Sequence, residues 1–270
     1  MFLTEIIELK KKRLKIAKAN RDFDRLKRSA VARRAGAKSH RLRENLQRDR
    51  INIIAEIKRA SPSKGVINDK IDVAELALSY EKGGACAISV LTEEDKFGGS
   101  LEDLQTAQNA VEIPILRKDF IFDEFQIYEA AASGADVILL IAAMLDDKQL
   151  AKLYDLAELD LGLDVLVEVH TLEELERVKK TNAKIIGINN RDLHSFKVSL
   201  DVSRELIKYA PENWLLVAES GLRAREEILE LRELGFAGFL IGETLMRSGN
   251  VAEELRELAT NKLEKPRKVF

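Results

Sequence analysis

The sequence predicts a (β/α)8 barrel, a closed sheet of eight parallel strands surrounded by helices, with an N-terminal helical extension. Six short apolar runs end in a group that can ionise or hydrogen-bond, or in glycine: IIAEIK, IPILRK, DVLVEV, KIIGIN, LLVAES and GFLIG. Runs of Ile, Val and Leu this short are typical of strands buried on both faces, and polar residues at the same end of each run indicate one rim of a parallel sheet. Strand candidates also alternate with amphipathic helical stretches at a repeat of roughly 30 residues, the unit length of such a barrel.

Chain length supports one barrel and sets the domain boundaries. The chain has 270 residues and 46% hydrophobic content, and a single α/β barrel domain uses roughly 250 residues. We expect residues 1–50 to form a basic helical extension that caps the barrel, and residues 51–270 to form one catalytic barrel domain. Eight units fit this length, whereas a doubly wound open sheet usually has fewer.

The extension begins with an amphipathic pattern. Residues 4–18 predict a helix, with Thr4 as a possible N-cap. Residues 19–50 carry helical signals but few apolar residues, and Gly36 interrupts them. We expect that segment to be charged and loosely held.

From Ile51 onward the elements alternate regularly. The predicted strands are 51–58, 85–91, 113–118, 135–142, 164–169, 184–189, 214–219 and 236–242. Helical stretches between them include 72–82, 123–133, 146–159, 172–180, 199–209 and 223–234. Neither a dinucleotide-binding G-x-G-x-x-G turn nor a P-loop is present, which argues against those nucleotide-binding folds.

Charge is distributed unevenly along the chain. Residues 1–50 hold 17 Lys or Arg against 6 Asp or Glu, whereas residues 51–270 hold 27 against 40. A polybasic start could suggest nucleic acid or an acidic membrane surface. Because this segment lacks interleaved aromatic residues, we favour a helical cap on the protein's own acidic body, and expect neither nucleic acid nor membrane as a partner.

The cysteine content and the first residues of the chain indicate where in the cell the protein is expected. Cys86 is the single cysteine and lies in the apolar run ACAISVL, so we expect a buried thiol and no disulfide framework. The start of the chain has no apolar run long enough for a signal peptide or a membrane span. We expect a cytoplasmic protein.

Candidate catalytic groups stand at the carboxyl ends of five predicted strands. Alternate residues of a strand point to the same face, and the carboxyl-terminal face of a barrel is where its enzymes keep their catalytic groups. Any one buried charge alone could be a structural ion pair, but convergence of five strand ends favours a functional cluster. Its predicted members are Glu56, Lys58, Lys118, Glu168, Asn189 and Glu219.

A phosphate site is predicted beside them. AESG at 218–221 and FLIGETLMR at 239–247 follow the seventh and eighth predicted strands. Glycine-rich loops and a short helix at these two positions form the phosphate pocket of many barrels. Gly221 or Gly242 alone is weak evidence, because most turn glycines only supply a positive φ.

Longer motifs resemble those of one enzyme family. The segment AEIKRASPSKG at 55–65 contains the E-x-K-x-x-S-P-S pattern of indole-3-glycerol phosphate synthases, which are barrel enzymes of tryptophan biosynthesis. LRKDF at 116–120, LVEVH at 166–170, IIGINNRDL at 185–193, VAESG at 217–221 and FLIGETLMR at 239–247 follow in that family's order. The similarity covers residues 51–250. It implies a carboxy-lyase that closes the pyrrole ring of 1-(2-carboxyphenylamino)-1-deoxyribulose 5-phosphate, losing carbon dioxide and water, without metal or organic cofactor.

The resemblance also implies roles for individual residues. Lys118 is the leading general acid at the ketone, Glu168 is the leading base, and Lys58 holds the substrate carboxylate and can share acid duty. Glu56 and Glu219 complete the charge network, and Asn189 and Arg191 orient the substrate or its neighbours. The implied substrate-binding residues are Ser61, Phe120, Leu139, Leu140, Arg191, Leu193, Ser220, Gly221, Gly242 and Glu243.

Two positions carry open alternatives. Glu243 stands in the phosphate loop where some relatives carry serine, and its anion would repel phosphate unless the side chain points away. His170 shares a face with Glu168 and could tune it or bind substrate, although a hydrogen-bonded structural histidine is the stronger interpretation.

Other functions remain as alternatives. A Schiff-base aldolase needs a lysine of lowered pKa, whereas the carboxylates of this cluster should keep Lys58 and Lys118 protonated. We rank that aldolase second and a sugar-phosphate isomerase close behind. A nucleic-acid- or partner-binding protein acting through the basic extension is the alternative from another class. We expect a monomer or weak homodimer acting on a small phosphorylated substrate.

Overall fold

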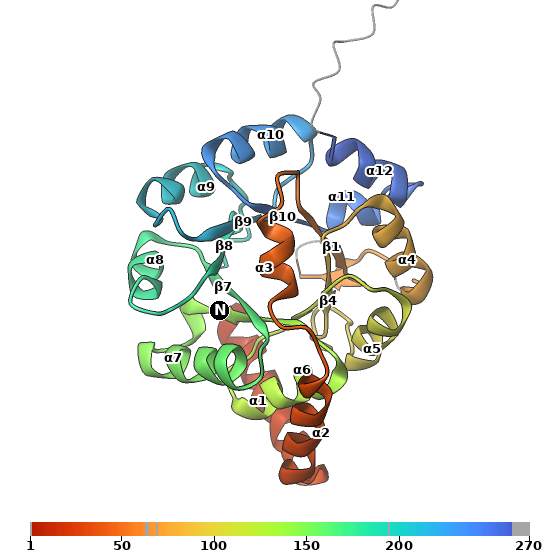
Figure 1. The fold of residues 1–270 in the computed structure, drawn as a ribbon, viewed down its shortest axis with the longest axis vertical. Coiled ribbons are helices and arrows are strands. Elements are labelled where there is room, and N and C mark those ends of the chain that lie inside the picture. Colours follow the sequence, from red (N-terminus) through yellow and green to blue (C-terminus); the bar gives the residue numbers. More distant parts are fainter. Residues whose placement is uncertain (1, 63–64, 69, 194, 261–270) are drawn as a thin grey trace, which may run out of the picture.

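The fold is a closed barrel of eight parallel strands, as predicted (Figure 1). A computed structural model describes residues 2–62, 65–68, 70–193 and 195–260. Neighbouring strands around the barrel follow the order β1-β10-β9-β8-β7-β6-β5-β4. Their bounds are β1 Ile53–Ile57, β4 Ala87–Leu91, β5 Ile115–Lys118, β6 Val137–Ile141, β7 Asp164–Val169, β8 Ile185–Asn189, β9 Leu215–Glu219 and β10 Gly238–Ile241.

Helices surround the barrel on its outer side (Figure 1). The predicted ones are α4 Val73–Gly83, α6 Glu124–Ser133, α7 Asp147–Asp155, α8 Leu172–Val178, α9 Asp201–Leu206 and α10 Arg225–Leu234. The structure adds helices α5 Leu101–Ala110, α11 Glu243–Met246 and α12 Val251–Leu258. Short turns of helix, η1 Ala142–Met144, η2 Leu156–Asp160 and η3 Ile207–Tyr209, and a small antiparallel pair, β2 Ala60–Ser61 and β3 Gly65–Val66, complete the elements.

Two apolar cores follow from the alternation of side chains along each strand. In β6, Val137, Leu139 and Ile141 point into the barrel, while Ile138 and Leu140 pack against the outer helices. Successive strand residues point to opposite faces, so every β6 residue is buried although only alternate ones can reach the barrel interior. Cys86 lies in the inner core and is buried, as predicted.

The extension consists of three helices that extend from one end of the barrel to the other. Helix α1 (Phe2–Asn20) lies near the carboxyl ends of the strands, where Lys10 Nζ contacts Asp119 Oδ1 at 2.8 Å. Helix α2 (Phe23–Ala35) packs along α6, and α3 (Arg41–Leu46) lies across the opposite end of the barrel (Figure 1).

The expectation of a loosely held segment at 19–50 is wrong. Leu42 and Leu46 of α3 are buried in the inner core, and the amide of Asn45 donates to the Cys86 carbonyl at 2.7 Å. Basic residues of the segment pair with acids of the barrel, for example Arg41 with Asp136 at 3.2 Å. A segment with few apolar residues is therefore held by a few deeply buried leucines and by charge, not by a continuous apolar stripe.

Within the described part of the chain, no helix combines the length and the apolar character needed to cross a bilayer.

Candidate active site

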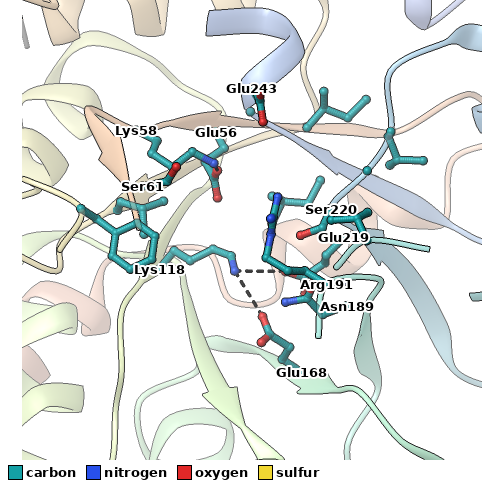
Figure 2. Close-up of a pocket in the computed structure, with 18 of the residues that line it drawn as sticks. Glu56, Lys58, Ser61, Lys118, Glu168, Asn189, Arg191, Glu219, Ser220 and Glu243 are labelled. Carbon is teal, nitrogen blue, oxygen red and sulfur yellow. Dashed lines mark hydrogen bonds and ion pairs between the residues drawn. The ribbon is translucent and has the colours of Figure 1, made fainter. Parts of the chain in front are cut away.

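A cavity of about 550 Å³ opens at the carboxyl ends of the strands, and the six predicted catalytic residues all line it (Figure 2). They come from the ends of β1, β5, β7, β8 and β9. Each strand places a residue whose side chain points inward at its last or next-to-last position, so five separate strands deliver polar groups to one space. These residues are Glu56, Lys58, Lys118, Glu168, Asn189 and Glu219.

Lys118 lies at the centre of this charge cluster. Its Nζ is 3.2 Å from Glu168 Oε2 and 3.1 Å from Glu219 Oε2 (Figure 2). Burial by itself would lower the pKa of Lys118, but the charges of Glu219 and Glu168 outweigh it and raise that pKa. Lys118 is therefore an ammonium group, a proton donor, at neutral pH.

Glu168 and Glu219 differ although both contact Lys118. Burial raises the pKa of each carboxyl group. At Glu168 this effect is outweighed by the charges of Lys118 and His170, which hold its pKa well below the usual range. At Glu219, burial and the repulsion from Glu168 both raise the pKa, and the charge of Lys118 lowers it. The first two effects prevail, and the pKa of Glu219 rises to about 8. Glu168 is thus ionised, while Glu219 can hold a proton near neutral pH.

A glycine makes room for Glu219. Gly187 lies on the neighbouring strand β8, and a Cβ atom at Gly187 would lie 2.0 Å from Glu219 Oε1. The side chain of Glu219 is only 1% exposed, so it has no alternative position in solvent. The glycine in the run KIIGIN is explained by this contact and not by its backbone angles.

Glu56 and Lys58 form a second pair on the β1 side of the cavity. Lys58 Nζ lies 2.5 Å from Glu56 Oε1. A Cβ atom at Gly242 would also lie 2.5 Å from Glu56 Oε1. Gly242 therefore admits the Glu56 carboxylate, a role separate from the predicted one in the phosphate loop.

The loops after β9 and β10 form the side of the cavity where phosphate binding is predicted. Ser220 and Gly221 have φ values of 65° and 86°, a left-handed turn that is unusual for serine. Thr244 Oγ1 donates to the Leu222 carbonyl at 2.9 Å and joins the two loops. Ser61, Ser220, Gly221, Gly242 and Glu243 all line the cavity.

Glu243 lines the cavity and has a cationic partner. Its Oε1 lies 3.3 Å from Arg247 Nη2, and both residues line the cavity. The guanidinium group offsets the repulsion that Glu243 would exert on an anion. The sequence prediction overlooked Arg247, together with Arg223 on the same side of the cavity.

Apolar side chains form the opposite wall. Phe120, Leu139 and Leu193 line the cavity as predicted from the resemblance. Leu140 does not: it packs on the outer helices, one residue out of phase with Leu139 on β6, so this prediction is wrong. Phe97, which the sequence prediction missed, adds an aromatic ring 6.3 Å from that of Phe120. It lies in a loop without periodicity, so no spacing could have indicated it.

Asn189 and Arg191 organise the loop after β8. Asn189 Oδ1 accepts a hydrogen bond from the Arg191 amide at 3.0 Å, and Arg191 Nη1 donates to the Phe196 carbonyl at 3.3 Å. Both side chains line the cavity. These contacts hold the loop in place.

This geometry defines a barrel enzyme with paired ammonium and carboxylate groups at the carboxyl ends of its strands, suited to acid–base chemistry. The family model described as indole-3-glycerol phosphate synthase matches residues 3–258. The chain belongs to the indole-3-glycerol phosphate synthase family. Enzymes of this family are carboxy-lyases that close the pyrrole ring of the anilino-deoxyribulose phosphate substrate, and that is the activity of this chain.

Curated relatives are similar in sequence to this chain over most of their length. The indole-3-glycerol phosphate synthase of Carboxydothermus hydrogenoformans is 43% identical over 263 residues, covering 96% of this chain and 99% of the relative. That of Dehalococcoides mccartyi is 48% identical over 211 residues, covering 77% and 81%.

Solved structures share the barrel at lower identity. A 3-hexulose-6-phosphate synthase from Salmonella typhimurium has a TM-score of 0.61 at 13% identity, covering 77% of this chain and 96% of its own. A thiamine phosphate pyrophosphorylase from Pyrococcus furiosus has a TM-score of 0.58 at 19% identity, covering 80% and 95%. At these identities the likeness shows the fold alone.

Proposed function

We propose that Lys118 is the general acid of the ring closure and Glu168 the base of the later dehydration. The position of the Lys118 ammonium group, between the carboxyl groups of Glu168 and Glu219 inside the cavity, is the observation that carries this assignment. The ketone oxygen of the substrate takes a proton as the ring carbon attacks the carbonyl carbon. An ammonium group held at that oxygen supplies the proton and stabilises the developing negative charge.

The Lys118–Glu168 pair determines the order of the proton transfers. While Lys118 is charged, it suppresses the basicity of Glu168, 3.2 Å away. Once Lys118 has given its proton to the ketone oxygen, that suppression is removed and Glu168 becomes a better proton acceptor. Glu219, whose pKa rises to about 8, can return a proton to Lys118 between turnovers.

The remaining residues fix the substrate. Lys58 binds the benzoate carboxylate, with Glu56 as its counter-ion, and Asn189 and Arg191 orient the reacting groups. The aromatic ring packs against the apolar wall, and the phosphate lies in the loops after β9 and β10. Such pinning holds the two reacting carbons of the same substrate molecule close together and correctly oriented for ring closure. The residues assigned to these ends are Ser61, Phe120, Leu139, Leu193, Ser220, Gly221, Gly242 and Glu243.

The same charges disfavour imine chemistry. A Schiff base forms from a neutral amine, and the contacts of Lys118 with Glu168 and Glu219 stabilise its charged form. Borohydride trapping of a substrate adduct on Lys118 would favour the aldolase alternative instead.

Replacing Lys118 by alanine tests the assignment. In a fluorescence assay of indole formation, Lys118→Ala should lower kcat by about a thousandfold, within the range that general acids contribute. Substrate binding, measured by titration, should persist, because the phosphate and aromatic contacts remain. Lys148→Ala, which changes an exposed lysine outside the cavity, is the matched control and should keep wild-type turnover. Near-normal turnover of Lys118→Ala would reject the role.

We further propose that residues 1–50 act as a cap on the catalytic barrel, and that the protein works in the cytoplasm as a monomer or weak homodimer without nucleic-acid or membrane partners. Pairing of the basic extension with the barrel's own acids supports this: Lys10, Arg13 and Arg41 contact Asp119, Asp95 and Asp136 respectively. A salt-dependent gel shift that disappears on deletion of residues 1–48 would contradict it.

A further inference from the structure

The imidazole of His170 lies between two carboxylates, behind the catalytic cavity. His170 directly follows β7, and its side chain is 9% exposed. Its Nε2 is 3.2 Å from Glu168 Oε1, and its Nδ1 is 3.3 Å from Glu174 Oε2. His170 is not among the residues that line the cavity. Its contact with the cavity-lining residues described above is through Glu168.

The surroundings of His170 favour a proton on both ring nitrogens. Each faces a carboxylate oxygen, which accepts hydrogen bonds and cannot donate one, and a neutral imidazole has only one N–H. Burial lowers the pKa of His170, but the carboxylates of Glu168 and Glu174 outweigh this and raise it to about 10. Of the charges on the other strands, Lys118 on β5 contacts Glu168, and Glu219 on β9 contacts Lys118. His170 is thus a fixed cation at neutral pH.

Glu174 holds the ring in place. Its Oε2 also accepts a hydrogen bond from the His170 backbone amide at 2.7 Å. The Glu174 amide in turn donates to Thr171 Oγ1 at 3.2 Å, the capping contact at the start of α8. The imidazolium is therefore tied to the first turn of a helix and does not depend on Glu168 for its orientation.

The two oxygens of Glu168 have separate partners. Oε1 contacts His170 and Oε2 contacts Lys118. We propose that His170 is a positioning residue for the ring closure: its imidazolium, braced by Glu174, fixes Glu168 through one carboxylate oxygen and leaves the other for Lys118 and the substrate.

This inference rests on the proposed role of Glu168 as base and assigns no proton transfer to His170. After Lys118 gives its proton to the ketone oxygen, Glu168 has lost one of its two cationic partners. His170 remains, keeps the carboxylate ionised, and prevents it from turning toward the neutral lysine. The base is then ready for the dehydration step in the orientation it had at the start.

The variant His170→Gln tests the positioning role, because glutamine can donate a hydrogen bond but carries no charge. We expect kcat to fall about tenfold or more, since small misplacement of a catalytic group can cost up to about a hundredfold. KM should stay within about twofold, because His170 does not reach the cavity. The acid limb of the kcat profile should move to higher pH, since loss of a cation raises the pKa of Glu168.

Two further variants keep the test decisive. Glu174→Gln leaves His170 in place but removes its brace, and should lower kcat in the same direction by a smaller factor. His40→Gln, at the opposite end of the barrel, is the matched control and should keep wild-type turnover. If His170→Gln fails to fold, the Glu174→Gln profile decides the question. An unchanged kcat and acid limb in whichever variant folds would overturn the proposal.

A double-mutant cycle separates this inference from the role of Glu168 itself. Near-normal turnover of Glu168→Gln would remove the proposed base, and with it the reason for positioning. If Glu168→Gln is impaired, adding His170→Gln should cause little further loss, because the two changes affect one unit. An equal loss from His170→Gln in both backgrounds would show an effect independent of Glu168 and would overturn the positioning role.

Discussion

The two ends of the barrel bury similar charges for different purposes, and strand β7 contributes to both. Its first residue, Asp164, lies at the end closed by α3, and Glu168 lies at the catalytic end. Asp164 Oδ2 accepts hydrogen bonds from the backbone amides of Leu42 and Arg43, at 2.8 and 3.1 Å. Glu168 instead contacts the side chains of Lys118 and His170.

The partners explain the opposite behaviour of the two carboxyl groups. Burial raises the pKa of Asp164, and the amide and charge of Arg43 offset this only in part. Burial also acts on Glu168, but two close cations hold its pKa low. Burial of charge is therefore common to both ends. What distinguishes the catalytic end is an open cavity and partners, such as Lys118, with protons that can move.

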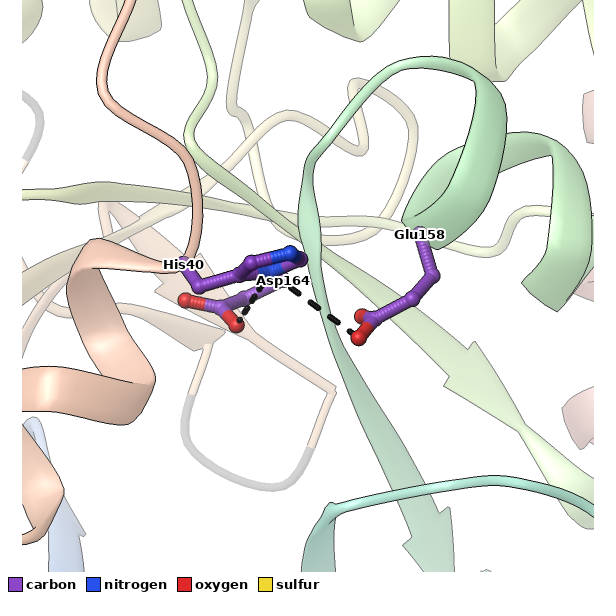
Figure 3. Close-up of side chains that lie close together, drawn as sticks. All are labelled: His40, Glu158 and Asp164. Carbon is purple, nitrogen blue, oxygen red and sulfur yellow. Dashed lines mark ion pairs between the residues drawn. The ribbon is translucent and has the colours of Figure 1, made fainter.

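The cluster at the closed end shows what such charges do outside the catalytic cavity. His40 Nδ1 lies 3.4 Å from Asp164 Oδ1 and 3.9 Å from Glu158 Oε1 (Figure 3). Their ligand atoms lie within 4.8 Å of one another, a spacing that a metal ion could use. The guanidinium of Arg43 already contacts Glu158, which disfavours a divalent cation there. The cluster joins α3 to the barrel.

Among changes that compare the two ends of the barrel without altering a charged residue, the largest effect should come from the catalytic end. Gly187→Ala would place a Cβ atom 2.0 Å from Glu219 Oε1 and push that carboxylate off Lys118. We expect kcat to fall about a hundredfold, the cost of a displacement of roughly 1 Å in a catalytic array.

Gly238→Ala is the matched control for that change. Its Cβ would lie 2.5 Å from Leu46 Cδ2 of α3, inside the closed end of the barrel. It should cost about 1–3 kcal/mol of unfolding free energy through overpacking and leave kcat within about twofold. Equal losses of turnover in the two alanine variants, measured alongside thermal unfolding, would contradict the division between the ends.

The barrel architecture was predictable from sequence because burial on both faces leaves a strong apolar pattern in each strand. The candidate catalytic cluster could be predicted for the same reason: an ionisable residue such as Lys118 or Glu219 interrupts that pattern at the strand end. Leu140 was misplaced because a strand buried on both faces gives no signal of which alternate residues point inward.

Other features depend on contacts between residues distant in sequence. Gly187 looks like any strand glycine until the side chain of Glu219, on the neighbouring strand, is placed beside it. The contacts that fix α3 to the barrel were not predicted, because its basic residues pair with carboxylates more than 90 positions away in the sequence, such as Asp136 and Asp164. No local periodicity records such pairs, whereas the amphipathic pattern of residues 4–18 is local and predicted α1.

An intermediate effect is expected at the closed end. Asp164→Ala removes the acceptor for two backbone amides at the start of α3 and should lower the unfolding free energy by about 2–3 kcal/mol. Asp164→Asn keeps an oxygen acceptor, discards a charge that burial already disfavours, and should cost less than about 1 kcal/mol. Both should retain near-wild-type kcat. Chemical denaturation with parallel assays measures this, and a loss of turnover in Asp164→Asn, with stability intact, would contradict a purely structural role.

The smallest effect concerns pH and stability at the catalytic end. The folded-state pKa of Glu219 is about 8, above the ordinary glutamate value of 4.5, so between these pH values the folded chain holds a proton that the unfolded chain has lost. Folding stability contributed by this group therefore falls as pH rises through that window. Glu219→Gln cannot ionise, and its stability relative to wild type should increase from pH 5 to pH 8 by about 1 kcal/mol, because Lys118 shares the charge. Denaturation midpoints of the two proteins across this range give the comparison. Parallel curves would place the ionisation of Glu219 outside the window, and would leave Lys118 facing two carboxylates that are both charged throughout.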